Sequence, residues 1–370
     1  MLFRHTTRDV IFSLVVDDFG VKYKKREDVD HLISVLTTVY DIATNWEGTK
    51  YLGYDLHHDK INRKLVLSMP TVIPRALKRF CPNGPPKPAA SPSIYTAPNY
   101  GKEGQQYAQD DTSPLLGPDD TLFIQQVNGV FLYYALALDC TFLPACADIA
   151  TTSAKPTQKT MDQINRLLGY AQLNPHNELV FRASDMILRA QNDSSYLTRP
   201  GAKSVAGGIW YLGYENDDTK LNGAIDVLSK TIDVVTASAG ESEYGTLFMV
   251  AQKSCPHRNT LDDIGYPQPP TQIIVDNEFA KGLANDQIKA KRSKAIDMRF
   301  HFVRDRVRQK QFEVIWKPGK DNLADFFTKA QPVWRHKEFM TKLIHKPLQQ
   351  TPRGSANHIK RSQAWKYRFP

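Results

Sequence analysis

The order of the predicted elements between residues 184 and 329 constrains the fold more than any other feature. Three strand-like segments, rich in β-branched and aromatic residues and separated by turn signals, contain MILRAQND, VAGGIWYLG and AIDVLSKTIDVV. A helix over residues 240–255, a strand in TQIIVDN and further helices follow. Three antiparallel strands before alternating strands and helices predict an α/β fold, with a mixed five-stranded sheet and flanking helices.

This layout is that of a ribonuclease-H-like sheet, and acidic residues stand at the element ends that it would bring together. They are Asp193 after the first strand, Glu241 and Glu243 in the long helix, Asp276 after the fourth strand, and Asp325 in a short final helix. Alone, each acid has an ordinary explanation, as a turn residue, a helix N-cap or a solvated helix residue. Together they would repel one another, and divalent cations relieve such repulsion. Mg²⁺ suits a few carboxylates with water and phosphate oxygens, so the order favours a metal site.

A second acidic feature lies near the start of the sequence. Asp17 and Asp18 stand where two apolar strands join, in FSLVVDDFGVKY. Tight hairpins usually turn on Asn-Gly or Asp-Gly, because both turn positions need φ > 0. Two aspartates at this point carry a conformational and an electrostatic cost, which suggests a metal site. An ordinary turn remains the alternative.

Charge and composition exclude several classes of protein. The chain has 48 Lys+Arg against 39 Asp+Glu, a net charge of +9, and a globular composition with 41% hydrophobic residues. No apolar run approaches the roughly 20 residues that span a bilayer, and no signal peptide is evident, so we expect an intracellular protein (in the cytoplasm, in a virus-like particle or in the nucleus) with no membrane partner. Four widely spaced cysteines predict free thiols rather than disulfides or a zinc site.

Basic residues cluster in two places. Residues 281–311 are strongly basic, and residues 346–370 contain six Lys or Arg and no acid. Contacts of this kind to phosphates position a nucleic acid without reading its sequence. The candidate phosphate contacts are Lys291, Arg292, Lys294, Arg299, Arg304 and Arg306. A solvated charged face is the alternative.

Changes in composition and residue patterning divide the chain into four regions. Residues 1–80 are compact and apolar-patterned, and residues 81–182 begin with a proline-rich stretch that reads as a linker and continue as mostly helical sequence, including a helix over Gln158–Leu173. Residues 183–345 form the ribonuclease-H-like region, and residues 346–370 are a basic tail.

Several sequence boxes are similar to those of one known family. They are residues 15–18 (VVDD), 46–53 (WEGTKYLG), 192–196 (NDSSY), 238–244 (SAGESEY), 275–277 (VDN), 292–302 (RSKAIDMRFHF) and 323–329 (LADFFTK). Together they resemble the Pol polyprotein of copia-type long-terminal-repeat retrotransposons, from the end of reverse transcriptase through ribonuclease H. The resemblance covers nearly the whole chain, and the last three boxes in this order make it specific.

The resemblance implies a site, a reaction and its partners. The catalytic and metal-binding quartet would be Asp193, Glu243, Asp276 and Asp325, with Glu243 preferred to Glu241 because the sequence after it fits the family better. Two Mg²⁺ (or Mn²⁺) ions would support hydrolysis of the RNA strand of an RNA/DNA hybrid, and other parts of Pol are expected partners. Cellular ribonucleases H carry a histidine before the last aspartate, whereas residues 316–321 (WKPGKD) contain none.

The same resemblance makes residues 1–80 an α+β remnant of a polymerase palm, with Asp17 and Asp18 as its metal-binding pair. A palm needs another metal-binding aspartate on a strand well upstream, and sixteen residues precede Asp17. We therefore expect an incomplete polymerase site and no reverse transcriptase activity in this chain. The alternatives are a catalytically inactive nucleic-acid-binding remnant and the product of a pseudogene.

Overall fold

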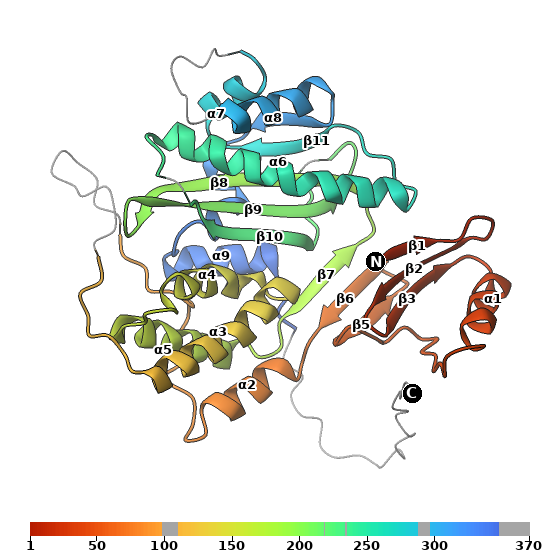
Figure 1. Ribbon diagram of the computed structural model, residues 1–370, viewed down its shortest axis with the longest axis horizontal. Coiled ribbons are helices and arrows are strands. Elements are labelled where there is room, and N and C mark those ends of the chain that lie inside the picture. Colours follow the sequence, from red (N-terminus) through yellow and green to blue (C-terminus); the bar gives the residue numbers. More distant parts are fainter. Residues whose placement is uncertain (98–109, 218, 234, 288–296, 348–370) are drawn as a thin grey trace.

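The computed structural model describes residues 1–97, 110–217, 219–233, 235–287 and 297–347, with the backbone alone over 297–300. Its central element is a mixed five-stranded sheet in the order β10-β9-β8-β11-β12 (Figure 1). The strands are β8 (Ile187–Arg199), β9 (Lys203–Gly213), β10 (Ala224–Thr231), β11 (Thr271–Val275) and β12 (Phe312–Trp316). The first three are antiparallel, and β11 and β12 run parallel to β8. The predicted mixed five-stranded sheet is confirmed.

Three helices cover one face of this sheet (Figure 1). They are α6 (Ala239–Asp263), α7 (Glu278–Ala284) and α8 (Asp297–Arg308). Their apolar side chains pack on inward-facing strand residues such as Leu188, Trp210 and Ile273, all of which are fully buried. Alternation along the strands sends the neighbouring residues to the opposite face. The sheet is therefore buried on both sides.

The other face is covered by the connection helices and by the C-terminal elements (Figure 1). These are α2 (Val72–Phe80), α3 (Pro118–Ala137), η1 (Cys140–Phe142), α4 (Leu143–Thr152), α5 (Gln158–Leu173), η2 (Gly319–Asp321), η3 (Leu323–Phe327) and α9 (Val333–Leu343). Helix α5 has the predicted bounds and begins with a capping box between Thr157 and Thr160. Phe142, Phe326 and Phe339 share one core, so the connection helices and the end of the chain are packed as a unit.

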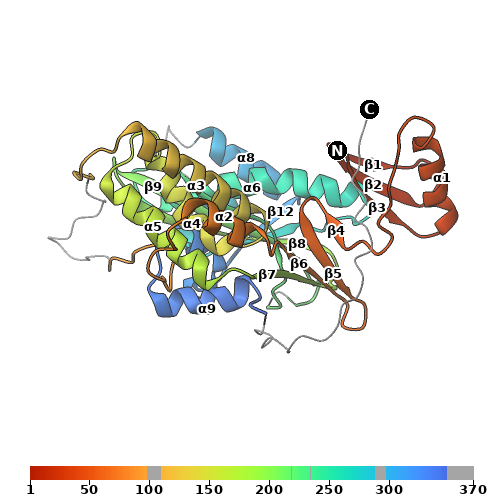
Figure 2. The same cartoon turned by 90° about the horizontal axis from the view of Figure 1, so that it is seen from below.

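Two smaller antiparallel sheets are formed mainly by residues N-terminal to the connection. The first contains β1 (Leu2–Arg4), β2 (Val10–Val15) and β3 (Asp18–Tyr23) and is followed by α1 (Arg26–Leu36). The second contains β4 (Lys50–Tyr51), β5 (Tyr54–Asp59), β6 (Lys64–Ser68) and β7 (Glu178–Arg182). Both views place the first sheet and α1 at the opposite end of the molecule from α5 (Figure 2).

Strand β7 crosses a boundary suggested by the sequence. Residues 178–182 fall in the region predicted to be mostly helical, yet they pair with β6 along its whole length. The region was expected to be mostly, not wholly, helical. Its ELVFR segment favours a strand, because it can bury alternate apolar residues against β6. The division of the chain at residues 80 and 182, and the palm character of residues 1–80, remain predictions.

All four cysteines lie in described segments and are free thiols, as predicted. No helix in the described part of the chain is long and apolar enough to cross a bilayer.

Candidate functional site

Three of the predicted carboxylates converge at one edge of the five-stranded sheet. Asp193 lies within β8, Glu243 lies near the start of α6, and Asp276 follows β11 directly. One oxygen of each lies within 4.8 Å of an oxygen of the other two. Across the described segments, no other three His, Cys, Asp or Glu residues come together in this way. Parallel pairing of β8 and β11 accounts for the meeting of Asp193 and Asp276.

Hydrogen bonds decide which glutamate of α6 reaches this cluster. The backbone N–H of Ser194 donates to Glu243 Oε1 at 2.9 Å, and Asn192 Nδ2 donates to Oε2 at 3.1 Å. Glu241 instead accepts from the backbone N–H of Ala237 at 2.9 Å, while its own N–H donates to the helix N-cap, Ser238. Glu241 therefore stabilises the start of the helix, and Glu243 faces the sheet.

The cluster is electrostatically strained. Burial raises the pKa of Asp193 to about 7, and the charges of Asp325 and Asp276 add to this rise. The hydrogen bond from the Thr328 hydroxyl opposes it. Burial and the charges of Asp193 and Asp276 raise the pKa of Glu243 well above its usual value. Burial also raises the pKa of Asp276, with Asp325 adding to the shift. The charged forms of all three carboxylates would be stabilised by a cation.

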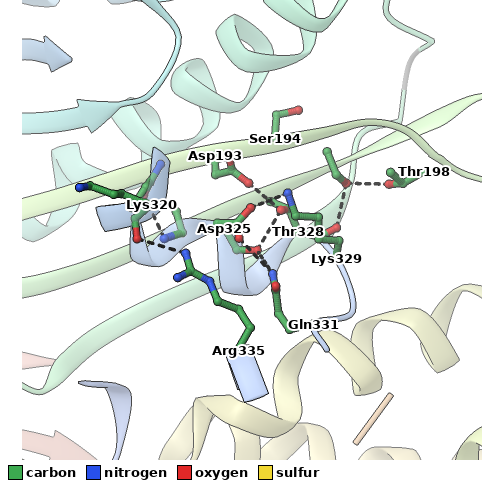
Figure 3. Close-up of polar contacts among 12 residues, drawn as sticks. Asp193, Ser194, Thr198, Lys320, Asp325, Thr328, Lys329, Gln331 and Arg335 are labelled. Atoms are coloured by element: carbon green, nitrogen blue, oxygen red, sulfur yellow. Dashed lines mark hydrogen bonds and ion pairs between the residues drawn. The ribbon is translucent and has the colours of Figure 1, made fainter. Parts of the chain in front are cut away.

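The fourth predicted carboxylate lies beside the other three rather than among them. Asp325 Oδ1 is 2.5 Å from Lys329 Nζ, and Asp325 Oδ2 accepts a hydrogen bond from Gln331 Nε2 at 3.1 Å (Figure 3). Its charge nevertheless raises the pKa of both Asp193 and Asp276, so it lies close enough to interact with them. Asp325 therefore lies near the cluster and is paired with a lysine, and its membership of a metal site stays a prediction.

The short helix η3 is held against the sheet behind these carboxylates. Asn322 Nδ2 donates to the carbonyl of Asn192 at 2.7 Å. Thr328 Oγ1 donates to Asp193 Oδ2 at 2.6 Å (Figure 3). Gly207, which pairs with Asp193 across the strands, makes this approach possible, because a Cβ there would lie 2.5 Å from the Thr328 methyl group.

Sequence reasoning missed several residues of the site. A Cβ on Gly319 would lie 2.6 Å from Asp276 Oδ2, so the loop before η3 needs a glycine at this position. Thr328, Lys329 and Gln331 hold Asp193 and Asp325, although no role was inferred for them. Thr328 and Lys329 stand in the LADFFTK box, which was the available signal.

The second predicted acidic feature has a different environment. Val15 pairs with Asp18, so β2 and β3 form the expected hairpin with Val16 and Asp17 at its turn. Val16 has φ +57°, an unusual conformation for a β-branched residue. Asp17 and Asp18 are exposed, and neither joins a group of three metal-ligating side chains within the described residues.

The predicted phosphate contacts are only partly visible. Lys291, Arg292 and Lys294 lie outside the described residues, and only the backbone of Arg299 is described. Arg304 pairs with Asp286, and Arg306 lies over the Phe302 ring and near Gln311 Oε1. Arg304 and Arg306 thus make contacts within the chain, and their binding to nucleic acid stays a prediction.

Comparisons with known proteins support the resemblance. No protein-family model matches the chain. It is 24% identical over 333 residues to the retrovirus-related Pol polyprotein from transposon TNT 1-94 of Nicotiana tabacum, a match that covers 87% of this chain and 23% of the relative. It is 26% identical over 192 residues to the Pol polyprotein from transposon RE1 of Arabidopsis thaliana, covering 51% of this chain and 12% of that relative. The chain spans less than a quarter of the length of these curated relatives.

Solved ribonuclease H structures also match part of the chain. LC11-RNase H1, isolated from compost, is 14% identical, with a TM-score of 0.30, over 39% of this chain and 93% of that chain. A structure of the same enzyme in complex with an RNA/DNA hybrid is 13% identical, with a TM-score of 0.30, over 38% and 93% of the two chains. TM-scores this low add no weight, so the account of the fold rests on the strand order and on the converging carboxylates.

Proposed function

We propose that this chain, whose curated homologues are Pol polyproteins of copia-type retrotransposons, is a ribonuclease H that hydrolyses the RNA strand of RNA/DNA hybrids with divalent metal ions. The observation that carries the proposal is the meeting of Asp193, Glu243 and Asp276 on a mixed sheet of the expected strand order. Other segments of the Pol polyprotein are its proposed partners.

The donor set fits a hard divalent cation. The site offers carboxylate oxygens and no histidine or cysteine ligand among the three clustered residues, which suits Mg²⁺ or Mn²⁺ rather than zinc or copper. Burial, and after it repulsion from neighbouring carboxylates, raises the pKa of Asp193, Glu243 and Asp276, and Lys329 opposes this rise. A bound cation would stabilise the charged forms further. We expect these three residues to hold one ion and Asp325 to contribute to a second.

Bound divalent ions in such a site activate a water molecule and stabilise charge on the phosphate during displacement. The protein's own contribution is to hold the ligands in place. Asn192 and the Ser194 backbone fix both oxygens of Glu243, and Thr328 fixes one oxygen of Asp193. Fixed ligand orientation is typically worth ten- to a hundredfold in metal affinity or activity. Selection of the RNA strand would come from contacts to its 2′-hydroxyl groups.

Templated DNA synthesis is not part of this proposal. Asp17 and Asp18 lie exposed on a hairpin, and the described residues bring no third metal ligand to them. The hairpin therefore gives no support for a second metal centre.

A cleavage assay tests the proposal. Purified chain is incubated with an end-labelled RNA/DNA hybrid in the presence of Mg²⁺, Mn²⁺ or EDTA, beside the matched variant Asp276→Asn. We expect RNA cleavage with either ion and none with EDTA or with the variant. Folded wild-type protein that binds the hybrid without any metal-dependent cut would instead support an inactive nucleic-acid-binding remnant.

A further inference from the structure

Lys329 occupies a position that has no role in the proposed reaction. Its Nζ lies 2.5 Å from Asp325 Oδ1, and Gln331 holds the other carboxylate oxygen (Figure 3). Lys329 also acts on the other three carboxylates. Its positive charge lowers the pKa of Asp193, Glu243 and Asp276, whereas burial raises it. One ammonium group therefore acts on all four acidic side chains of the site.

We propose that the Lys329 ammonium group takes the place of the second divalent ion beside Asp325 in the resting protein, so that this ion binds only when Lys329 moves away. The inference rests on the proposed function, because the divalent ions are those of the nuclease site. Two cations cannot share one carboxylate oxygen without repulsion, and Lys329 holds Oδ1 at ion-pair distance.

The surroundings of Lys329 permit this exchange. Its side chain is 50% exposed, whereas that of Asp325 is 17% exposed, so the lysine can leave without disturbing the core. Asp193, Glu243 and Asp276 lie together as a group of three possible metal ligands that does not include Asp325, the ion-pair partner of Lys329. The site therefore binds its two ions unequally: the first directly, the second in competition with a side chain.

Metal titration without nucleic acid tests this inference. Lys329→Met is compared with wild type by calorimetric titration with Mg²⁺ and by thermal melting across a Mg²⁺ series. We expect the variant to bind the second ion roughly five- to tenfold more tightly, the scale of a typical coupling between two sites. We also expect it to melt below wild type in EDTA, and this difference to shrink as Mg²⁺ replaces the missing ammonium group.

Two control variants make the result decisive. Lys337→Met removes an exposed lysine of α9 and should change neither the affinity nor the melting temperature. Lys329→Arg keeps the charge and should behave as wild type. Lys329→Gln also removes the charge, and it takes the place of Lys329→Met if that variant fails to fold. Equal Mg²⁺ affinities, with a melting difference that does not depend on Mg²⁺, would overturn the inference and leave Lys329 as a structural ion pair. If only the proposed function is wrong, the wild-type protein would not cleave the hybrid, while wild type and Lys329→Met would still differ in Mg²⁺ affinity as expected here.

A second, independent observation concerns the far end of the β4–β7 sheet. A hollow of about 390 Å³ lies between the tip of the β5–β6 hairpin and the end of β7. Leu65 and Phe181 supply apolar surface, and the basic lining residues are His58, Lys60, Arg63, Lys64 and Arg182. The one acidic lining residue, Asp59, accepts hydrogen bonds from Asn62 on both carboxylate oxygens, at 2.9 and 2.7 Å.

The hollow has more basic than acidic lining residues, and Asp59 is the acid that interacts with Lys64. Lys64 and Arg182 are direct cross-strand partners, an arrangement that destabilises a sheet when the charges are alike. Arg63 has φ +52°, so the hairpin tip also carries backbone strain. We infer that this hollow binds phosphate groups of the nucleic-acid backbone outside the cleavage site. This inference rests on the proposed function, which identifies the nucleic acid as an RNA/DNA hybrid.

Hybrid binding measured in EDTA, which prevents cleavage, tests the hollow. Arg63→Ala/Arg182→Ala is compared with Lys155→Ala/Lys337→Ala, which removes two exposed charges elsewhere. Arg63→Ala/Arg182→Ala should weaken hybrid binding. It should also flatten the slope of log K against log salt by roughly 1 to 2 units, because each lost phosphate contact changes the slope by about 0.9. The control pair should change the slope little. Equal slopes for the two double variants would overturn the inference. If inorganic phosphate lowers hybrid binding more than another salt at equal ionic strength, and the Arg63→Ala/Arg182→Ala slope is unchanged, the hollow binds a free anion instead.

Discussion

The sequence suggests a metal site at two sets of acidic residues in this chain, and the two sets differ in almost every physical respect. Asp17 and Asp18 are neighbours on an exposed hairpin turn, and their carboxylates face solvent. Asp193, Glu243 and Asp276 are far apart in sequence, yet the strand order brings one oxygen of each within 4.8 Å of the others. Adjacent acids on a turn avoid repulsion through water, whereas buried acids that the fold forces together need a cation.

The difference shows what a metal site requires besides carboxylates. Glu243 is held by donors from β8, and Asp193 is held by Thr328. The three ligands come from β8, from α6 and from the residue after β11. The Asp17–Asp18 turn has no comparable frame among the described residues. Convergence and fixed orientation, rather than the density of acids in the sequence, separate the two regions.

The largest expected effect comes from Asp193→Asn. Loss of a central ligand should lower hybrid cleavage by at least about a hundredfold, since even residues that only orient metal ligands are worth ten- to a hundredfold. The same change removes a buried charge, so the metal-free protein should melt at the same or a higher temperature. Cleavage of labelled hybrid and melting in EDTA check the two halves. A variant that cuts like wild type would place the chemistry elsewhere.

Proton binding gives the next effect. The pKa of Asp193 is about 7 in the folded protein, against 3.8 for an ordinary aspartate. Between these values the folded state binds more protons, so the metal-free protein should lose stability as the pH rises from 4 to 7, by up to about 4 kcal/mol from this group. Melting in EDTA from pH 4.5 to 8 should show this loss, and Asp193→Asn should reduce it. Equal pH profiles for the two proteins would contradict the strained cluster.

Gly319→Ala should have a smaller effect on the same site. A Cβ at this position would lie 2.6 Å from Asp276 Oδ2, so the carboxylate must shift. We expect about tenfold weaker Mg²⁺ binding, measured by calorimetry. Gly129→Ala is the matched control, because a Cβ there meets nothing within 4 Å in helix α3. That control should raise helix stability by about 1 kcal/mol and leave Mg²⁺ binding unchanged.

The smallest effect is expected at the hairpin. Asp17→Asn/Asp18→Asn should leave the Mg²⁺-induced rise in melting temperature unchanged, because neither carboxylate belongs to the described cluster. Thermal melting across a Mg²⁺ series measures it. A lost Mg²⁺ response would show that the hairpin binds metal, and would remove the contrast between the two regions.

Much of the architecture is readable from the sequence because it depends on local patterns. The sequence predicts the helix over Gln158–Leu173 that the structure shows as α5, and strand-like segments in order predict the five-stranded sheet. The pairing of β7 with β6 is not readable in this way, because more than a hundred residues separate two short strands whose partners are set by packing.

The same distinction, between what strand order determines and what side-chain geometry determines, applies to the residues of the site. Asp276 directly follows β11, which runs parallel to β8, so its meeting with Asp193 follows from strand order. The sequence suggested that the first strand ends at Asp193, whereas β8 continues to Arg199. The pairing of Asp325 with Lys329, the role of Glu241 at the helix start and the close approach of Gly319 depend on side-chain geometry. Spacing along the chain does not contain that geometry.

The central claim is that the buried carboxylates form the divalent metal site of a hybrid-cleaving nuclease, and a paired assay of wild type and Asp276→Asn tests it most directly. Both proteins are titrated with Mg²⁺ while RNA cleavage in a labelled hybrid and the melting temperature are recorded together. The account predicts that wild type gains both stability and cleavage over the same Mg²⁺ range, and that Asp276→Asn stays folded and gains neither. A wild-type protein that is folded and shows no Mg²⁺ response in either measurement would contradict it.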